Sequence, residues 1–386
     1  MGCFEMPTPE SRKFVLVGGG HAHIQVLEDL AENPLPRDDV HVVLVVDKPI
    51  AVYSGMVPGF VAGQYQTRQL QIDVRPWASR AGVELCIGRV VGLDPRNRII
   101  QTEDGKKISY DLASFDIGST VTGLDLPGVR EHALATRPID AFIEKIDRLL
   151  SKSAERNSSE PFHLVVVGGG AGGVELAFTL QHRLQSVTDR LVATTIIESG
   201  QRILKGLPES IAKRAERWCC KRGLTIKNNE RVTSVNQTEL LLESGEYIRC
   251  DTLVWVTGPT SQPLFTKAGL STERRGFVHV RPTLQFVDHD NLFAAGDCAT
   301  LIDYPNTPKA GVHAVRQGAL LAKNLRATLN GTPLRKYKPQ GDFLMLLNLG
   351  GGHAIGAKWG RSFEGKWVMT LKDQIDRRFM KRFQIS

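Results

Sequence analysis

Two segments of the chain, 150 residues apart, each carry a run of aliphatic residues that ends in three glycines. The first covers residues 14–20 and the second residues 163–170. A β-branched run of this kind is typical of a central parallel strand that is covered on both faces, and the residues after each run have helical spacing. The sequence therefore predicts an α/β fold in which a strand, a glycine turn and a helix occur twice.

Each predicted unit continues with a second apolar strand that ends in an acidic residue. Asp47 lies 29 residues after Gly18, and Glu198 lies 30 residues after Gly168. In a βαβ unit this distance brings a carboxylate to the ribose of a dinucleotide, while the glycines let backbone N–H groups approach its diphosphate. The matched spacings predict two dinucleotide-binding sites of the Rossmann type.

The two glycine patterns differ at their third position. Gly173 completes the second pattern, whereas His23 occupies the corresponding position in the first. We expect the first helix to pack slightly farther from its sheet, or to turn the imidazole outward. His21 and His23 would then lie near the diphosphate, and two alternatives stay open: they contact the dinucleotide, or they only fill the turn.

The length of 386 residues exceeds the size of one ordinary core, so more than one domain is expected. A polar stretch at residues 151–160 and a Pro-Gly pair at 127–128 mark crossovers. We predict one domain from residues 12–125 and 259–335, a second, inserted domain from 126–258, and a C-terminal region at 336–386 with an amphipathic helix.

The basic charge, +8 with a pI near 9.2, favours anionic partners such as dinucleotides, although a solvated basic surface explains it equally well. No zinc-type or nucleic-acid-binding motif accompanies it, so neither a metal nor a nucleic acid is expected. The six cysteines form no CxxC pair, which fits a reducing compartment and leaves no dithiol for disulfide reduction beside a flavin.

Neither a membrane-spanning run nor a signal peptide is expected, so the predicted location is a cytoplasmic or organellar compartment. Near the C-terminus, Leu371, Ile375 and Phe379 repeat at every fourth position beside basic residues. This stripe fits docking on the chain's own domain, and it also fits peripheral contact with a membrane.

Further motifs resemble those of the pyridine nucleotide-disulfide oxidoreductase superfamily. Residues 292–297 (LFAAGD) resemble its second FAD motif, and residues 254–258 (VWVTG) and 115–119 (FDIGS) resemble its domain crossings. The resemblance implies two three-layer domains like those of glutathione reductase. It implies FAD in the first domain and NADH or NADPH in the second.

Within the superfamily, the chain resembles the branch of type II NADH dehydrogenases, sulfide:quinone reductases and apoptosis-inducing factor. Residues 53–59, 308–311 and 371–380 are similar to the NADH dehydrogenase-like flavoprotein module found fused to selenide, water dikinase. The quinone-site pattern A-Q-x-x-x-Q is absent, because its positions read Gly311-Val312 and Arg316. The single Cys298 beside the flavin Asp lacks the partner cysteine that sulfide:quinone reductases use.

The resemblance also implies residue roles. Glu175 would be the catalytic acid near the nicotinamide, although an acid in a first helical turn is also favoured by the helix dipole. Glu198 favours NADH because it would repel a 2′-phosphate, while Arg202 keeps NADPH open. The expected FAD contacts are Gly18, Gly20, His21, His23, Asp47, Lys48, Ser54, Gly118, Asp297, Lys309, Ala310 and Gly311. The expected NAD(P)H contacts are Gly168, Gly170, Gly173, Glu198 and Gly258.

These observations predict an FAD-dependent NAD(P)H dehydrogenase that passes hydride to FAD and then electrons to a quinone or another small acceptor. Two alternatives stay open. One is a flavoprotein of selenium or sulfur metabolism, and the other is a redox-responsive binding protein like apoptosis-inducing factor. A homodimer is also left open.

Overall fold

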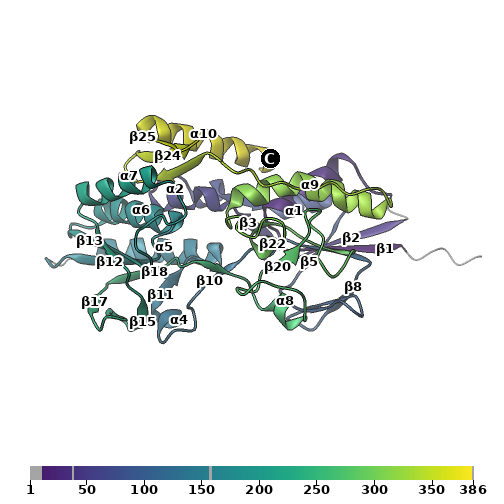
Figure 1. The fold of residues 1–386 in the computed structure, drawn as a ribbon, viewed down its shortest axis with the longest axis horizontal. Coiled ribbons are helices and arrows are strands. Elements are labelled where there is room, and N and C mark those ends of the chain that lie inside the picture. Colours follow the sequence, from purple (N-terminus) through teal and green to yellow (C-terminus); the bar gives the residue numbers. More distant parts are fainter. Residues whose placement is uncertain (1–10, 37–38, 156–158, 385–386) are drawn as a thin grey trace, which may run out of the picture.

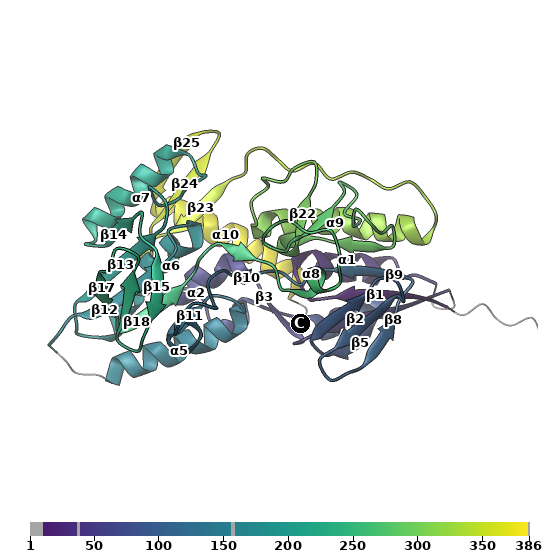
Figure 2. The same ribbon diagram turned by 60° about the horizontal axis from the view of Figure 1, so that its bottom comes forward.

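The computed structural model describes residues 11–36, 39–155 and 159–384, and two lobes are visible in it (Figure 1). Each lobe is built around a five-stranded sheet with helices beside it, and the two sheets lie in separate lobes (Figure 2). Helix α10 (Lys366–Phe383) lies across both lobes near the C-terminus. The predicted α/β fold with two Rossmann-like sheets is confirmed.

The first sheet is parallel and has the strand order β21-β9-β1-β2-β5. Its strands are β1 (Arg12–Val17), β2 (Val40–Val46), β5 (Glu84–Ile87), β9 (Leu112–Phe115) and β21 (Leu292–Ala294). The central strand β1 is buried from Phe14 to Val17, as expected for a strand covered on both faces. Helix α1 (His21–Glu32) follows β1 and packs against α9 (Gly311–Leu329).

The second sheet repeats this arrangement, with the order β11-β18-β12-β13-β14 and all strands parallel. Its strands are β11 (Ala133–Ala135), β12 (Phe162–Val167), β13 (Val192–Glu198), β14 (Thr225–Asn228) and β18 (Thr252–Trp255). Helix α6 (Ala171–Val187) follows β12 as α1 follows β1. The repeat in the sequence is therefore a repeat in the structure.

Two segments that cross between the lobes lie side by side. The crossing segments β10 (Thr120–Val121) and β19 (Pro259–Thr260) pair with each other in antiparallel fashion. The predicted domain boundaries at 126 and 258 lie close to these crossings and stay a proposal.

Smaller elements complete the lobes. Those of the first lobe are β3 (Ile50–Val52), η1 (Ser54–Met56), α2 (Val57–Val61), η2 (Thr67–Gln69), β4 (Gln71–Asp73), α3 (Val74–Ala81), β6 (Val90–Asp94), β7 (Ile99–Thr102), β8 (Lys107–Ser109), α8 (Leu264–Lys267), β20 (Val278–Val280), η3 (Gly296–Cys298) and β22 (Ala299–Leu301). Those of the second are α4 (Val129–His132), α5 (Ile139–Glu155), α7 (Glu209–Lys221), β15 (Val232–Val235), β16 (Glu239–Leu242) and β17 (Tyr247–Arg249).

The C-terminal region forms an antiparallel sheet of β23 (Met345–Asn348), β24 (Ala354–Lys358) and β25 (Arg361–Gly365), followed by α10. Helix α10 docks on the rest of the chain, but not through the face that the sequence suggested. Its buried residues are Val368, Met369, Lys372, Asp376, Met380 and Phe383. Of the predicted stripe, Leu371 and Phe379 are only partly buried and Ile375 is 43 % exposed. Among the described residues, no helix is both long and apolar enough to cross a membrane.

Candidate active site between two dinucleotide cradles

The second glycine turn joins β12 to α6 and is shaped by close backbone contacts. Gly168 has φ +117°, and a Cβ on it would lie 2.4 Å from the carbonyl oxygen of Val256. A Cβ on Gly173 would lie 1.8 Å from the carbonyl oxygen of Gly168. A Cβ on Gly170, in contrast, would meet no atom within 4 Å. The backbone at Gly170 is therefore open to a ligand, as a diphosphate cradle at a helix N-terminus requires.

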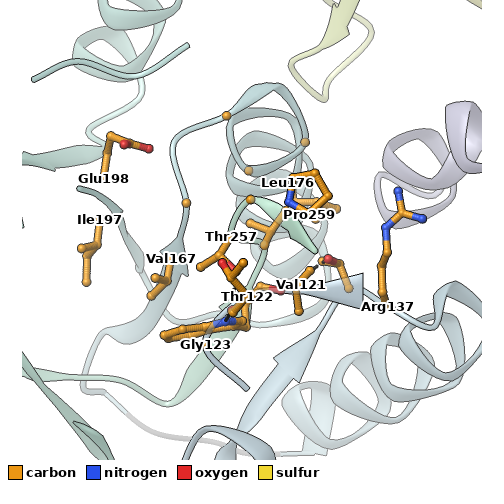
Figure 3. A pocket seen from close by; sticks show the side chains of 18 of the residues that line it. Val121, Thr122, Gly123, Arg137, Val167, Leu176, Ile197, Glu198, Thr257 and Pro259 are labelled. Atoms are coloured by element: carbon orange, nitrogen blue, oxygen red, sulfur yellow. Dashed lines mark hydrogen bonds between the residues drawn. The ribbon is translucent and has the colours of Figure 1, made fainter. Parts of the chain in front are cut away.

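A cavity of about 830 Å³ extends from this turn toward the first lobe. Figure 3 shows Glu198 on one side of it and Arg137 on the other. The predicted site residues in its lining are Ser54, Gly168, Gly170, Gly173, Glu175, Glu198, Gly258 and Lys309. Residues from both lobes thus face one cavity, whose size is in the range of small-molecule sites.

Glu198, at the end of β13, is held by two backbone groups. Its Oε2 accepts a 2.7 Å hydrogen bond from the N–H of Gly169, and its Oε1 accepts one of 2.6 Å from the N–H of Gly200. Arg202 instead donates to loop carbonyls, including a 2.9 Å hydrogen bond to Leu207. The carboxylate is therefore fixed beside the glycine turn, and the nearby guanidinium is engaged elsewhere.

In the first cradle, the imidazole of His23 does not turn outward and fits the alternative in which it fills the turn. It is fully buried and lies over the sheet, with Nδ1 2.7 Å from the carbonyl oxygen of Gly18 and Nε2 2.9 Å from Oγ of Ser114. Because a carbonyl only accepts, Nδ1 carries the proton and Nε2 accepts from the serine. Burial lowers the pKa of His23 to about 4, so the ring is neutral. It points into the lobe, neither outward nor toward a bound dinucleotide.

His21, the other predicted histidine, lies at the start of α1 against the ring of Tyr53, with centroids 5.4 Å apart. Burial lowers its pKa to about 4. Its neighbour Tyr53 stacks on Phe379 of α10 at 4.5 Å. His21 is thus placed at the cradle, in an aromatic cluster that α10 completes.

The polar groups expected near a flavin come together at the N-terminus of α9. Asp297 forms a 3.0 Å ion pair with Arg137, a residue that no sequence motif indicated. Lys309 donates a 2.9 Å hydrogen bond to Oγ1 of Thr300, and burial lowers its pKa to about 8. A Cβ on Gly311 would lie 3.5 Å from Oγ of Ser54. Two turns, one from each half of the first lobe, therefore meet here, and Ala310 caps α9 between them.

The remaining predicted FAD contacts lie at the ends of strands in the first lobe. Asp47 follows β2 and accepts a 3.0 Å hydrogen bond from the N–H of Lys48. Lys48 forms an ion pair with Asp140 of α5, and this hydrogen bond raises the pKa of the lysine. Gly118 has φ +65°, a conformation that favours glycine, in the crossing that follows β9.

Glu175 lines the cavity in the first turn of α6 and meets the C-terminal region behind it. Its Oε1 accepts a 2.8 Å hydrogen bond from the backbone N–H of Asn348. Burial raises the pKa of Glu175 to about 7, while the charge of Lys372 opposes that rise. Lys372 donates hydrogen bonds of 2.9 Å to the carbonyl of Gly55 and to Oδ2 of Asp376.

Lys372 and Asp376 lie in the C-terminal segment for which the sequence predicted only an amphipathic helix with basic residues. Tyr53 donates a 3.2 Å hydrogen bond to Oδ1 of Asp376, so the pair is tied to the loop before η1. Their opposite charges at a spacing of four residues were a visible signal. Nothing in the sequence showed that this face of the helix would be buried.

At the positions of the quinone-site pattern, Val312 is partly buried, and Arg316 has a buried Nη1 without a hydrogen-bond partner among the described residues.

Cys298 is also buried, and burial raises its pKa to about 12. All described cysteines are free. A thiol with so high a pKa is a poor nucleophile at neutral pH, which disfavours the sulfur-chemistry alternative.

Two glycine turns, each between a central parallel strand and a helix, together with a cavity lined by residues of both lobes, define a protein with a double dinucleotide-binding fold. Residues 12–318 match the model of the family described as pyridine nucleotide-disulphide oxidoreductase. The chain belongs to this family, and the family prediction is confirmed.

Known relatives agree with the predicted branch. NADH dehydrogenase-like protein YutJ of Bacillus subtilis is 26 % identical over 329 residues, which are 85 % of this chain and 87 % of that protein. The type II NADH:quinone oxidoreductase of Haemophilus influenzae is 23 % identical, and the aligned region covers 91 % of this chain and 88 % of that protein. The structure of NDH2 from Plasmodium falciparum in complex with NADH superposes with a TM-score of 0.80 at 14 % identity, covering 96 % of each chain. The resemblance to the module fused to selenide, water dikinase stays a prediction.

Proposed function

We propose that this protein is an FAD-dependent NADH dehydrogenase that delivers electrons to a quinone or another small acceptor. The observation that carries the proposal is the single cavity lined both by the open turn at Gly170 and by the flavin-side residues Ser54 and Lys309. The names of the relatives support the same activity. FAD bound in the first cradle would supply the hydride chemistry.

We infer that the second cradle holds NADH. The open backbone at Gly170 and the N-terminus of α6 would bind the diphosphate, since both present N–H groups and positive potential. Glu198 is fixed where it would accept a hydrogen bond from a ribose 2′-hydroxyl. The side chain of Arg202 is committed to loop carbonyls, which supports NADH over NADPH.

The first cradle would hold FAD through contributions from both halves of its lobe. The turn after β1 would bind the diphosphate, and Asp297 with its partner Arg137 would meet the ribitol and phosphates. The N-terminus of α9 and Lys309 would place positive potential at the pyrimidine end of the flavin ring. The groups that line the space are thus suited to an anionic dinucleotide.

Glu175 is our proposed catalytic residue, because it lines the cavity to which both lobes contribute. A carboxyl with a pKa of about 7 can hold or release a proton near neutral pH. Its hydrogen bond from Asn348 orients it, and the ammonium of Lys372 lies behind it. This arrangement would position a proton beside the site of hydride transfer.

An anaerobic titration of the purified holoenzyme tests the proposal. We expect NADH to bleach the visible flavin absorbance and soluble quinones to restore it, because the flavin would accept and then release electrons. Absence of bleaching with both NADH and NADPH would overturn the assignment. Reoxidation by selenium compounds but not by quinones would leave the dehydrogenase and reject the quinone.

We also infer contact with a membrane surface through the C-terminal region. Trp359 at the tip of the β24–β25 hairpin is 79 % exposed, Trp367 is 57 % exposed, and Ile375 on α10 is 43 % exposed. Exposed basic residues of the same region are Lys366, Arg378 and Lys381. Exposed tryptophans beside basic residues suit an anionic interface. A homodimer stays a prediction, which sedimentation at several concentrations would measure.

A further inference from the structure

The internal repeat allows the two cradles to be compared position by position. In the second unit, β18 is followed by Val256, whose carbonyl oxygen lies against Gly168. In the first unit, β9 is followed by Asp116, whose carbonyl oxygen lies against Gly18 in the same way. The two residues are equivalent, so an ionisable side chain in one cradle stands where the other has an aliphatic one.

The carboxyl group of Asp116 lies at the N-terminus of α1. Its Oδ2 accepts hydrogen bonds of 2.7 Å from the N–H of Ala22 and 3.1 Å from the N–H of His23. Its carbonyl oxygen accepts a further one of 3.2 Å from Gly20. Asp116 therefore uses N–H groups of a helix N-terminus of the kind that bind phosphate in other dinucleotide sites.

The same carboxyl group lies between the two turns that would hold FAD. A Cβ on Gly20 would be 2.3 Å from the carboxyl carbon of Asp116, and a Cβ on Gly296 would be 2.8 Å from its Oδ1. At the equivalent position of the second unit, Gly170 has no atom within 4 Å of its Cβ position. The first cradle thus has a buried carboxyl in the space beside Gly20, and the corresponding space beside Gly170 in the second is open.

We propose that Asp116 couples the binding of FAD to the uptake of one proton, because a carboxylate in this cradle would repel the diphosphate. The inference rests on the proposed placement of FAD in the first cradle. Protonation of Oδ1 removes the repulsion and leaves Oδ2 to accept the two N–H bonds from α1. In the second cradle, where Val256 takes this place, NADH binding involves no such proton.

The surroundings of Asp116 support protonation near neutral pH. Burial raises its pKa to about 7, against the lowering effect of the N–H groups of His23 and Ala22, and the charge of Asp297 raises it further. From η3, the thiol of Cys298 also faces it and is neutral, because burial raises the pKa of that thiol to about 12. On α1, burial makes both His21 and His23 neutral, with a pKa of about 4.

The remaining charges near the cradle are already paired or lie farther away. Arg137 forms an ion pair with Asp297 at 3.0 Å. Lys309 interacts electrostatically with Cys298 and Asp297. Neither is hydrogen-bonded to the carboxyl of Asp116 among the described residues. A nearby diphosphate would therefore raise the pKa of Asp116 above this value of about 7.

The sign of the pH dependence follows from this shift. Below pH 7 the carboxyl is protonated with or without FAD, so the dissociation constant is independent of pH. Above pH 7 one proton is taken up on binding, and the dissociation constant of FAD rises about tenfold per pH unit. The rise ends at the higher pKa of the complex.

The experiment measures release of fluorescent FAD from the holoenzyme between pH 6 and pH 9. In wild type, the dissociation constant should be constant at first and then rise about tenfold per unit. In Asp116→Asn, whose amide oxygen can still accept both N–H bonds, the rise should disappear. Asp111→Asn is the matched control, because it makes the same chemical change on the exposed side before β9, and it should keep the wild-type slope.

Three outcomes separate the hypotheses. Equal slopes in wild type and Asp116→Asn would overturn the role of Asp116. If that variant does not fold, calorimetry of FAD binding to wild type in two buffers of different ionisation enthalpy gives the number of protons taken up. If no proton is taken up at pH 8, the role of Asp116 is overturned in this case too. Failure of the protein to hold FAD at any pH would instead reject the proposed function.

Discussion

The ammonium group of Lys372 donates a 2.9 Å hydrogen bond to the backbone carbonyl of Gly55, 317 positions earlier in the chain. Through this bond the C-terminal helix fixes the loop that would contact the flavin. The same ammonium pairs with Asp376 and approaches Glu175, so one lysine links α10 with both lobes. Helix α10 therefore supports the site from behind Gly55 and Glu175.

Removal of this cation should destabilise the protein. Lys372→Met leaves Asp376 buried without its partner, and we expect the free energy of unfolding to fall by about 3 kcal/mol. Denaturant unfolding measures the change. Lys381→Met, on the exposed face of the same helix, should stay within about 0.5 kcal/mol of wild type. Equal stability of the two variants would show that the buried pair contributes nothing.

Glu175→Gln tests the proposed acid. The rate of flavin reduction by NADH should fall about 100-fold, because a positioned acid or base contributes at least this much. The change in rate centred near pH 7, the pKa to which burial raises Glu175, should also disappear. Stopped-flow reduction across pH 5 to pH 9 measures both. An unchanged pH profile would make Glu175 a structural residue.

The same substitution should alter stability in a direction set by the pKa. Because burial raises the pKa of Glu175 from 4.5 to about 7 in the folded protein, its contribution is present below pH 4.5 and is lost as pH rises through 7. Glu175→Gln should therefore gain about 3 kcal/mol relative to wild type between these limits. Unfolding midpoints at pH 5 and pH 8 provide the measurement, and a relative loss would contradict it.

Cofactor preference should depend on Glu198 and not on Arg202. Glu198→Ala removes two hydrogen bonds to the glycine turn and the expected one to the ribose, so KM for NADH should rise about tenfold or more. Arg202→Ala should leave KM for NADPH unchanged, because this guanidinium binds loop carbonyls. Steady-state kinetics with NADH and NADPH measure both KM values. A higher KM for NADPH in Arg202→Ala would support NADPH as the coenzyme.

Membrane contact can be tested at the hairpin tip. Replacing Trp359 and Trp367 by serine should reduce binding to anionic vesicles roughly tenfold, because both side chains would bury apolar surface in the interface. Tyr247→Ser, at an equally exposed aromatic residue on the second lobe, is the control. Co-sedimentation measures the bound fraction. Equal binding of wild type and both variants would show that these tryptophans do not contact the membrane.

His23→Gly restores the third glycine and should be destabilising. The substitution leaves the carbonyl of Gly18 and the hydroxyl of Ser114 without their buried partner, at a cost of about 3 kcal/mol. Thermal unfolding of the apoprotein measures the loss. A gain in stability would mean that the imidazole is a strained substitute.

The duplicated architecture was predictable because it is encoded locally. Each glycine turn, at Gly18 and at Gly168, directly follows its strand in the sequence, and strand and helix periodicities are equally local. The orientation of His23 was not predictable, because its partner Ser114 comes from a strand 91 positions later. From the glycine pattern alone, we expected either a helix packed farther from its sheet or an imidazole turned outward.

The C-terminal helix was misread for the same reason. Its apolar stripe suggested the docking face, but Lys372 and Asp376 are buried because Tyr53 and Gly55 supply partners that helical periodicity cannot reveal. Arg137 was missed because it belongs to no local motif and gains its role only through Asp297, 160 positions away. Residues whose function depends on distant partners lie beyond the reach of a local pattern.

The outer strand β21 of the first sheet comes from residues 292–294, after the whole of the second unit has been made. During synthesis, the strands β11 to β18 can therefore assemble while β9 still has an unpaired edge. We expect the second unit to fold before the first on the ribosome, because the first unit has to wait for its last strand. Exposed strand edges invite aggregation, so premature termination before residue 292 should yield a product that depends on chaperones.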